Sequence, residues 1–189
     1  VVAIAKALPI CLYPKYKNGI FTQIGEKQNL TQNIAPYDQT HLLVTYQDSI
    51  SLLNMNTLEQ KNVCEINNTF QISSLFYDNK GEVLWIGTST DGLFYLDMQK
   101  KLLLPFSDFP KQPIGVITES SDSTLLVGID GQGVWELDKD KKKVLNILKE
   151  DIDNPFSLRG DGVYDIYCDG KQRVWVATYT GGLSFFDWK

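Results

Sequence analysis

The chain carries few of the side chains that most enzymes use for catalysis. His41 is the single histidine among 189 residues, and Cys11, Cys64 and Cys168 are the only cysteines. A catalytic histidine needs a nucleophile and an orienting acid within reach, and the sequence holds no nucleophile-elbow motif. The cysteines form no CxxC pair of the kind that binds zinc, and their disulfide state stays open. We therefore interpret His41 as a surface turn residue and expect neither a metal nor a cofactor.

Three further segments suggest chemistry but have the wrong spacing or context. A calcium loop could begin at Asp151, but it needs glycine at its sixth position and glutamate at its twelfth. Those positions hold Phe156 and Gly162. Asp130–Gly133 is too short for a phosphate-binding loop and does not precede a helix, so we interpret it as a hairpin turn. Lys139–Lys143 is typical of a solvated, charged turn.

The composition indicates a folded protein that does not bind nucleic acid. Hydrophobic residues make up 43% of the chain, charged residues 22%, and the net charge is −5. This balance is that of an ordinary globular domain, and it lacks the basic excess that nucleic acids require. The apolar segment Val1–Pro14 is shorter than the roughly 20 residues of a membrane-spanning helix, so we interpret it as a buried strand. No membrane contact by this chain is expected.

An internal repeat decides the predicted architecture. Leu84–Asp97 and Val174–Asp187 share tryptophan, threonine, glycine, leucine and aspartate at matching positions, and Leu125–Asp138 repeats the frame with leucine in the tryptophan position. Leu43–Asn54 is a weaker copy, and Lys17–Phe21 is a decayed one. The glycine position of the four clear copies is occupied by Ser49, Gly92, Gly133 and Gly182. A period of roughly 40–50 residues is typical of β-propeller blades.

Each repeat reads as about four short strands. In the best copy these are Gln71–Tyr77, Val83–Ile86, Leu93–Leu96 and Lys101–Pro105, separated by turn-forming residues. The second and third strands are apolar on both faces, so both faces must be covered. Stacked propeller blades provide that cover. The segment Lys141–Glu150 has a weak helical pattern, but its place in the repeat favours a fourth strand.

The predicted fold class is therefore all-β. We expect a β-propeller fragment of about four four-stranded blades that forms part of a larger, seven-bladed ring. The whole chain is one propeller region, with Trp85 and Trp175 in equivalent buried positions. Its blade-like units are 1–30 (partial), 31–69, 70–110, 111–160 and 161–189 (partial).

Two parts of the chain carry a more specific pattern. One is Tyr77–Thr88, and the other combines Asn154–Leu158, Val163–Tyr167, Arg173–Thr178 and Gly181–Leu183. The pattern resembles the two-component regulator propeller repeat, which is found in periplasmic sensor regions of hybrid two-component systems, notably in gut Bacteroidetes. The resemblance covers about residues 30–189 and is weak before residue 60.

The resemblance implies an extracytoplasmic sensor. Such a propeller binds a nutrient or glycan-derived signal and relays it through a transmembrane helix to a cytoplasmic histidine kinase. It implies a periplasmic location as part of an inner-membrane protein, with an oligosaccharide or other small molecule as the signal. The kinase is not in this chain, so the chain alone is expected not to be an enzyme.

We expect a ligand on one particular face of the propeller. Strands within a blade are antiparallel, so the turns between second and third strands share a face with the links between blades. Loops on rigid scaffolds often carry function, and the link 151–162 mixes charged, aromatic and glycine residues. Arg159 and Tyr179 are the residues that we expect to hold a polar ligand. The full set of candidate ligand-binding residues is Arg159, Asp161, Tyr179, Asp130, Gln132 and Asp91.

Two other classes of function stay open. A propeller enzyme, such as a polysaccharide lyase or a quinone-dependent dehydrogenase, needs charged residues where the first strands begin, and this chain has Ile72, Ile114 and Val163 there. A protein-interaction scaffold would share the fold. The sequence stops after a third strand, at Asp187–Lys189, which favours an open arc over a closed ring of four blades. An open arc should pair with a second copy or with the remaining blades of the parent propeller.

Overall fold

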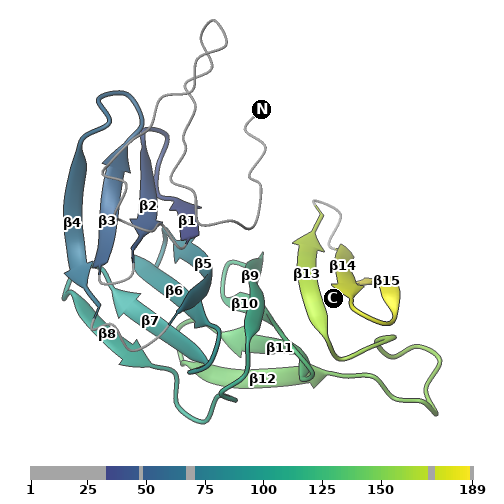
Figure 1. Ribbon diagram of the computed structural model, residues 1–189. Coiled ribbons are helices and arrows are strands. Elements are labelled where there is room, and N and C mark those ends of the chain that lie inside the picture. The colour runs from purple at the N-terminus through teal and green to yellow at the C-terminus, as the bar shows by residue number, and fades with distance from the viewer. Residues whose placement is uncertain (1–32, 47–48, 67–70, 170–172, 188–189) are drawn as a thin grey trace, which may run out of the picture. The chain divides into compact units, whose positions relative to one another are not determined.

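The computed structural model describes residues 33–46, 49–66, 71–169 and 173–187. Every regular element in these residues is a β-strand, and the strands form four antiparallel sheets, labelled in Figure 1. The prediction of an all-β chain built from propeller blades is confirmed. Among these residues no helix is long and apolar enough to cross a membrane. The predictions for Val1–Pro14, Lys17–Phe21, Cys11 and the partial unit 1–30 lie outside the described residues.

The chain divides into two compact units, residues 1–69 and 70–189. The first unit contains one sheet with the strand order β1-β2-β3-β4. Its strands are β1 (Asn33–Pro36), β2 (His41–Thr45), β3 (Ser49–Asn54) and β4 (Gln60–Glu65). Val44, Tyr46 and Leu53 form a buried apolar cluster on this sheet.

The second unit contains three sheets in succession along the chain. The first comprises β5 (Ile72–Asp78), β6 (Val83–Thr88), β7 (Leu93–Asp97) and β8 (Leu102–Pro105). The second comprises β9 (Ile114–Ser121), β10 (Thr124–Ile129), β11 (Gly133–Asp138) and β12 (Lys143–Leu148). The third comprises β13 (Val163–Cys168), β14 (Arg173–Thr178) and β15 (Gly182–Asp187), so it has three strands within the described residues. The segment that could have been a helix forms strand β12, as its place in the repeat predicts.

Glycine marks the hairpin turn that precedes the third strand of each of these sheets. Gly92, Gly133 and Gly182 have φ angles of 82°, 75° and 72°, in the left-handed region that favours glycine. At Gly133 an added Cβ would also overlap the carbonyl oxygen of Leu148. The left-handed backbone conformation of these turns therefore explains why glycine recurs at this position of the repeat.

The three sheets of the second unit stack through two apolar layers. Strand β9 contacts both β5 and β13, which places the second sheet between the other two (Figure 1). One layer packs Trp85 and Leu93 against side chains of the second sheet such as Leu125 and Val127. The other layer contains Val116, Leu126, Val134, Val163, Ile166, Val174 and Val176. Both faces of the second sheet are therefore covered, which explains why its strands are apolar on both faces.

The two repeated tryptophans have the same register but different environments. Trp85 pairs across strands with Phe76 and Tyr95, and Trp175 pairs in the same way with Tyr167 and Phe185. Trp85 is completely buried, whereas Trp175 is half-buried. The prediction of equivalent burial is wrong because the second sheet covers Trp85, while Trp175 faces outward from the third sheet.

The lysine-rich turn after β11 is not a simple solvated turn, contrary to expectation. Lys139 is only 2% exposed, and its Nζ lies 3.2 Å from Asp78 Oδ1 and 2.5 Å from Glu119 Oε1. Nζ of Lys142 lies 4.5 Å from the centre of the Trp85 ring, within the range of a cation–π contact. The turn packs against the preceding sheet, so these two lysines join the first and second sheets.

Candidate functional site

The turns and links that the sequence placed on one face are joined there by backbone hydrogen bonds. The amide of Asp130, in the β10–β11 turn, donates to the carbonyl of Pro113, just before β9 (2.9 Å). The amide of Tyr179, in the β14–β15 turn, donates to the carbonyl of Gly162, just before β13 (2.8 Å). These bonds hold each turn against the link that enters its own sheet, so the candidate residues stand on a rigid base.

Three of the predicted residues gather around Gly162. A Cβ added to this glycine would lie 3.3 Å from Oδ1 of Asp130 and 3.4 Å from Cβ of Tyr179. The carbonyl of the preceding residue, Asp161, accepts a hydrogen bond from the amide of Gly133 (2.9 Å), and its Oδ1 accepts one from the amide of Glu150 (2.6 Å). Asp130, Asp161 and Tyr179 therefore form one cluster contributed by the second and third sheets.

Arg159 is fixed beside this cluster by the loop that carries it. In that loop the Asp151 amide donates to Ser157 Oγ at 2.9 Å, and the Ser157 hydroxyl donates back to the Asp151 carbonyl at 2.9 Å. Nη2 of Arg159 donates to the carbonyl of Pro155 (3.3 Å). A Cβ added to Gly181 would overlap the Arg159 carbonyl, so the backbone of Arg159 lies directly against the β14–β15 turn. The backbone of Arg159 thus lies beside the turn that carries Tyr179, while its exposed side chain bonds within its own loop.

Gln132 and Asp91 lie at the margin of the cluster or beyond it. Oε1 of Gln132 accepts a hydrogen bond from Nζ of Lys149 (2.8 Å), and its carbonyl accepts one from Nε1 of Trp135 (3.1 Å). Asp91 lies in the β6–β7 turn of the preceding sheet, where its carboxylate accepts a hydrogen bond from Thr90 Oγ1 (2.7 Å). The structure therefore brings Asp130, Asp161, Tyr179 and Arg159 together, with Gln132 beside them, and leaves Asp91 in a separate turn.

Sequence reasoning missed Tyr164. Its ring meets the ring of Tyr179 edge to face, with centroids 5.7 Å apart and planes at 90°. Both side chains are largely exposed, at 60% and 73%. The register of β13 against β14 shifts between Val163 and Asp165, which takes Tyr164 out of the ladder. Strand alternation alone does not predict such a bulge. One available signal in the sequence is the tyrosine that directly follows the apolar Val163.

The side chains of the cluster offer the chemical groups that a polar ligand would contact. Two tyrosines offer aromatic faces, Arg159 offers hydrogen-bond donors, and Asp130 and Asp161 offer acceptors. Within the described ranges no group of three or more His, Cys, Asp or Glu side chains could hold a metal ion. Cys168 is a free thiol, and burial raises the pKa of this thiol, which opposes formation of a reactive thiolate.

A second candidate lies in the first unit, around His41. His41 begins strand β2 and is more than a turn residue, because its Nδ1 lies 3.0 Å from Asp38 Oδ2 and its Nε2 lies 3.2 Å from Asn54 Nδ2. A hydrogen bond from the Thr40 amide is the main cause that lowers the pKa of Asp38, to about 2, with further bonds from Thr40 and His41.

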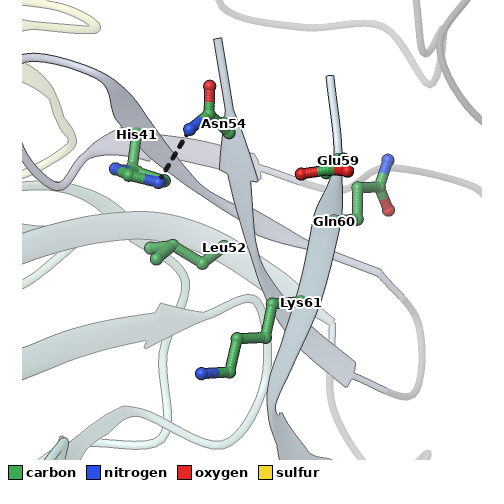
Figure 2. A pocket seen from close by; sticks show the side chains of 6 residues that line it. All are labelled: His41, Leu52, Asn54, Glu59, Gln60 and Lys61. Carbon is green, nitrogen blue, oxygen red and sulfur yellow. Dashed lines mark hydrogen bonds between the residues drawn. The ribbon is translucent and has the colours of Figure 1, made fainter. Parts of the chain in front are cut away.

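A shallow hollow of about 500 Å³ borders this histidine (Figure 2). Its lining consists of His41, Leu52, Asn54, Glu59, Gln60 and Lys61. None of these is a serine or cysteine nucleophile, and both ring nitrogens of His41 already have partners. The aspartate–histidine pair therefore orders the start of β2, and we do not assign it a catalytic role.

Comparison with known families identifies the segment that carries the main cluster. A family model described as "Two component regulator propeller" matches residues 157–180. The predicted resemblance is thereby confirmed in the last sheet. The repeat runs from the loop before β13 to the turn after β14, so Arg159, Asp161, Tyr164 and Tyr179 all belong to it.

Similar proteins include a histidine kinase and the extracellular domains of two signalling systems. Histidine kinase P4 of Formosa agariphila is 27% identical over 108 residues, which cover 53% of this chain and 8% of that protein. The extracellular domain of a one component system from B. thetaiotaomicron superimposes with a TM-score of 0.74 at 17% identity, covering 92% of this chain and 24% of that one. The extracellular domain of a hybrid two component system from the same organism gives a TM-score of 0.69 at 21% identity, with 92% and 23% covered. The chain therefore spans less than a quarter of each of these proteins and shares the fold of the two solved domains.

Proposed function

We propose that this chain is part of the extracytoplasmic, ligand-sensing propeller of a hybrid two-component receptor. The observation that carries the proposal is the repeat at residues 157–180, which holds the exposed tyrosine pair and Arg159 on one face. The histidine kinase relative and the extracellular domains with the same fold support it. On this proposal the chain resides in the periplasm, and the parent protein crosses the inner membrane and continues to a cytoplasmic histidine kinase.

The signal in this proposal is an oligosaccharide or another small polar nutrient. The faces of Tyr164 and Tyr179 can stack on the apolar face of a sugar ring. Arg159 can donate to hydroxyl or carboxylate oxygens, and Asp130 and Asp161 can accept from hydroxyl groups. The sensing segment binds without turning over its ligand, because nothing in the cluster combines a nucleophile with a general base.

Calorimetry with a panel of neutral and uronic-acid oligosaccharides tests this function. For any oligosaccharide that binds, Tyr179→Ala or Arg159→Ala should weaken affinity by about tenfold, equivalent to about 1.4 kcal/mol, and leave the far-ultraviolet circular dichroism unchanged. Tyr167→Ala is the matched control, because Tyr167 is an exposed tyrosine of strand β13 on the other face of the sheet from the buried Ile166. Equal affinity in the two site variants and the wild type would remove the assignment. Release of new reducing ends during incubation would instead favour a lyase.

A further inference from the structure

The charges of the second unit differ between the two ends of its strands. Six salt bridges lie at the end opposite the candidate site, in the turns between first and second strands and between third and fourth strands. They join Lys80 to Asp122, Lys100 to Asp97, Lys139 to Asp78 and Glu119, Lys141 to Asp138, and Arg173 to Asp169. The carboxylates in these pairs therefore have their counter-charges within the protein.

The carboxylates of the candidate site have no such counter-charges. Neither Asp130 nor Asp161 forms a salt bridge with a lysine or arginine of the described residues. The link between β12 and β13, which carries Asp161, holds four acidic and two basic residues. Both basic side chains have other partners, because Lys149 donates to Gln132 and Arg159 donates within its own loop. The site is therefore negatively charged and lacks an internal cation to balance it.

The tyrosine pair stands beside one of these carboxylates. The rings of Tyr164 and Tyr179 are perpendicular, with centroids 5.7 Å apart, so they form two walls of a corner. Oδ1 of Asp130 and Cβ of Tyr179 lie 3.3 Å and 3.4 Å from the same point, which is where a Cβ on Gly162 would be. The face of an aromatic ring carries partial negative charge, so the rings and the carboxylate both attract a cation.

We infer that this cluster binds a protonated amine carried by a sugar ring. The inference rests on the proposed sensing function and narrows its ligand to oligosaccharides that contain amino sugars. The ammonium group lies between the tyrosine rings and Asp130, where cation–π contacts and a charge-assisted hydrogen bond both favour it. The apolar face of the sugar contacts the rest of the aromatic surface. A uronic acid would instead bring a carboxylate next to Asp130 and Asp161, and like charges repel.

Calorimetry with three compounds tests this inference. A fully deacetylated chito-oligosaccharide carries an amine on every ring. Its N-acetylated counterpart has the same rings without the charge, and spermidine has charged amines without a sugar. We expect the deacetylated oligosaccharide to bind at least tenfold more tightly than either of the others at low salt. Its affinity should fall as sodium chloride is added, because salt screens the attraction between exposed charges.

Two aspartate variants separate a local contact from the net charge of the chain. Asp130→Asn should weaken binding of the deacetylated oligosaccharide by about tenfold, the loss expected for a hydrogen bond to a charged group. Asp153→Asn is the matched control and should leave the affinity unchanged. Asp153 is likewise exposed, but its amide bonds within the loop and not to either turn. Tyr164→Ala should weaken binding as Asp130→Asn does, and unchanged far-ultraviolet circular dichroism checks that each variant is folded.

Several results would overturn the inference. Equal affinity for the deacetylated and N-acetylated oligosaccharides would show that the charge is not recognised, and equal affinity for spermidine would show that the sugar is not. Equal losses in Asp130→Asn and Asp153→Asn would reduce the effect to net charge. Binding of a neutral or uronic-acid oligosaccharide through Tyr179, without binding of the deacetylated one, would contradict this inference and leave the proposed sensing function in place. Binding of no oligosaccharide at all would contradict both.

Discussion

Lys139→Ala should destabilise the second unit far more than the loss of an ordinary surface lysine. The side chain of Lys139 is buried, and its ammonium group lies 3.2 Å from the carboxylate of Asp78, which is buried as well. Removing the lysine leaves this carboxylate without its buried counter-charge. Asp78 keeps a hydrogen bond from the amide of Lys80 (3.2 Å), and this bond compensates for only part of the lost interaction.

The geometry sets the size of the effect. At 3.2 Å and an effective dielectric constant of about 20, two unit charges attract by about 5 kcal/mol. Removing one partner of a buried ion pair lowers the free energy of unfolding by about 3–5 kcal/mol. Because the Lys80 amide still donates to Asp78, we expect a loss near the lower end of this range. A typical domain has a free energy of unfolding of only about 5–15 kcal/mol. With a urea m-value of about 1–3 kcal/mol per molar, the midpoint of unfolding should fall by at least about 1 M.

Urea titration followed by tryptophan fluorescence measures this shift. All four tryptophans belong to residues 70–189, so their emission follows the unit that contains the pair. Lys141→Ala is the control, because Lys141 forms a salt bridge of similar length with Asp138 (3.1 Å) but is 74% exposed. An exposed pair of this kind contributes about 1 kcal/mol or less.

A pair of further variants separates charge from packing. Lys139→Met keeps most of the side-chain volume, and adding Asp78→Asn removes the unpaired charge, so the double variant should recover part of the stability lost in Lys139→Met. If Lys139→Ala and Lys141→Ala shift the midpoint equally, the buried pair does not stabilise the stack and the reasoning is wrong.

Two other predictions concern single positions in β11 and the turn before it. Glu136→Gln should stabilise the chain at neutral pH, because burial raises the pKa of this carboxyl above its ordinary value of 4.5 in the folded state. The folded state then binds more protons than the unfolded state between the two pKa values, so stability falls as pH rises through that window. The gain should vanish below pH 4.5, and a gain that does not change with pH in urea titrations would contradict it. Gly133→Ala should cost more than about 1 kcal/mol and more than Gly131→Ala in the same titrations, because both glycines have positive φ but only Gly133 has a carbonyl in the way; equal losses would show that the overlap relaxes freely.

The strands and turns of the second unit could be predicted from sequence because they depend on local chemistry. The apolar segments 83–86 and 93–96 lie within β6 and β7, and the Asp91-Gly92 turn separates them. The burial of Trp175 could not be predicted, because it depends on what covers the sheet and not on the repeat itself. The same limit applies to Lys139, which looks like part of a solvated lysine cluster until the neighbouring sheet supplies Asp78.

The sequence predicts which face carries the candidate residues but not which of their side chains lie together on it. Antiparallel strand order alone places Arg159, Asp161 and Tyr179 on one face, and the backbone hydrogen bonds of the turns hold them there. Asp91 belongs to a separate turn, since repeat position gives the face but not the distance between turns. Tyr164 joins the site through a bulge, and a bulge is a local register shift that residue types do not specify.

The position shared by Trp85, Leu126 and Trp175 bears on how such repeats change over time. Nε1 of Trp85 is buried with no hydrogen-bond partner in the described part of the chain, and Leu126 has no such group, yet both side chains fill the space between sheets. Both residues supply apolar volume at this position, and the indole nitrogen of Trp85 makes no hydrogen bond there. Leu126 shows that an isobutyl group can fill this position in a buried stack, whereas at Trp85 the same exchange would remove the contact with Lys142. Repeats of this kind can consequently lose their recognisable sequence pattern while the fold that they form is retained.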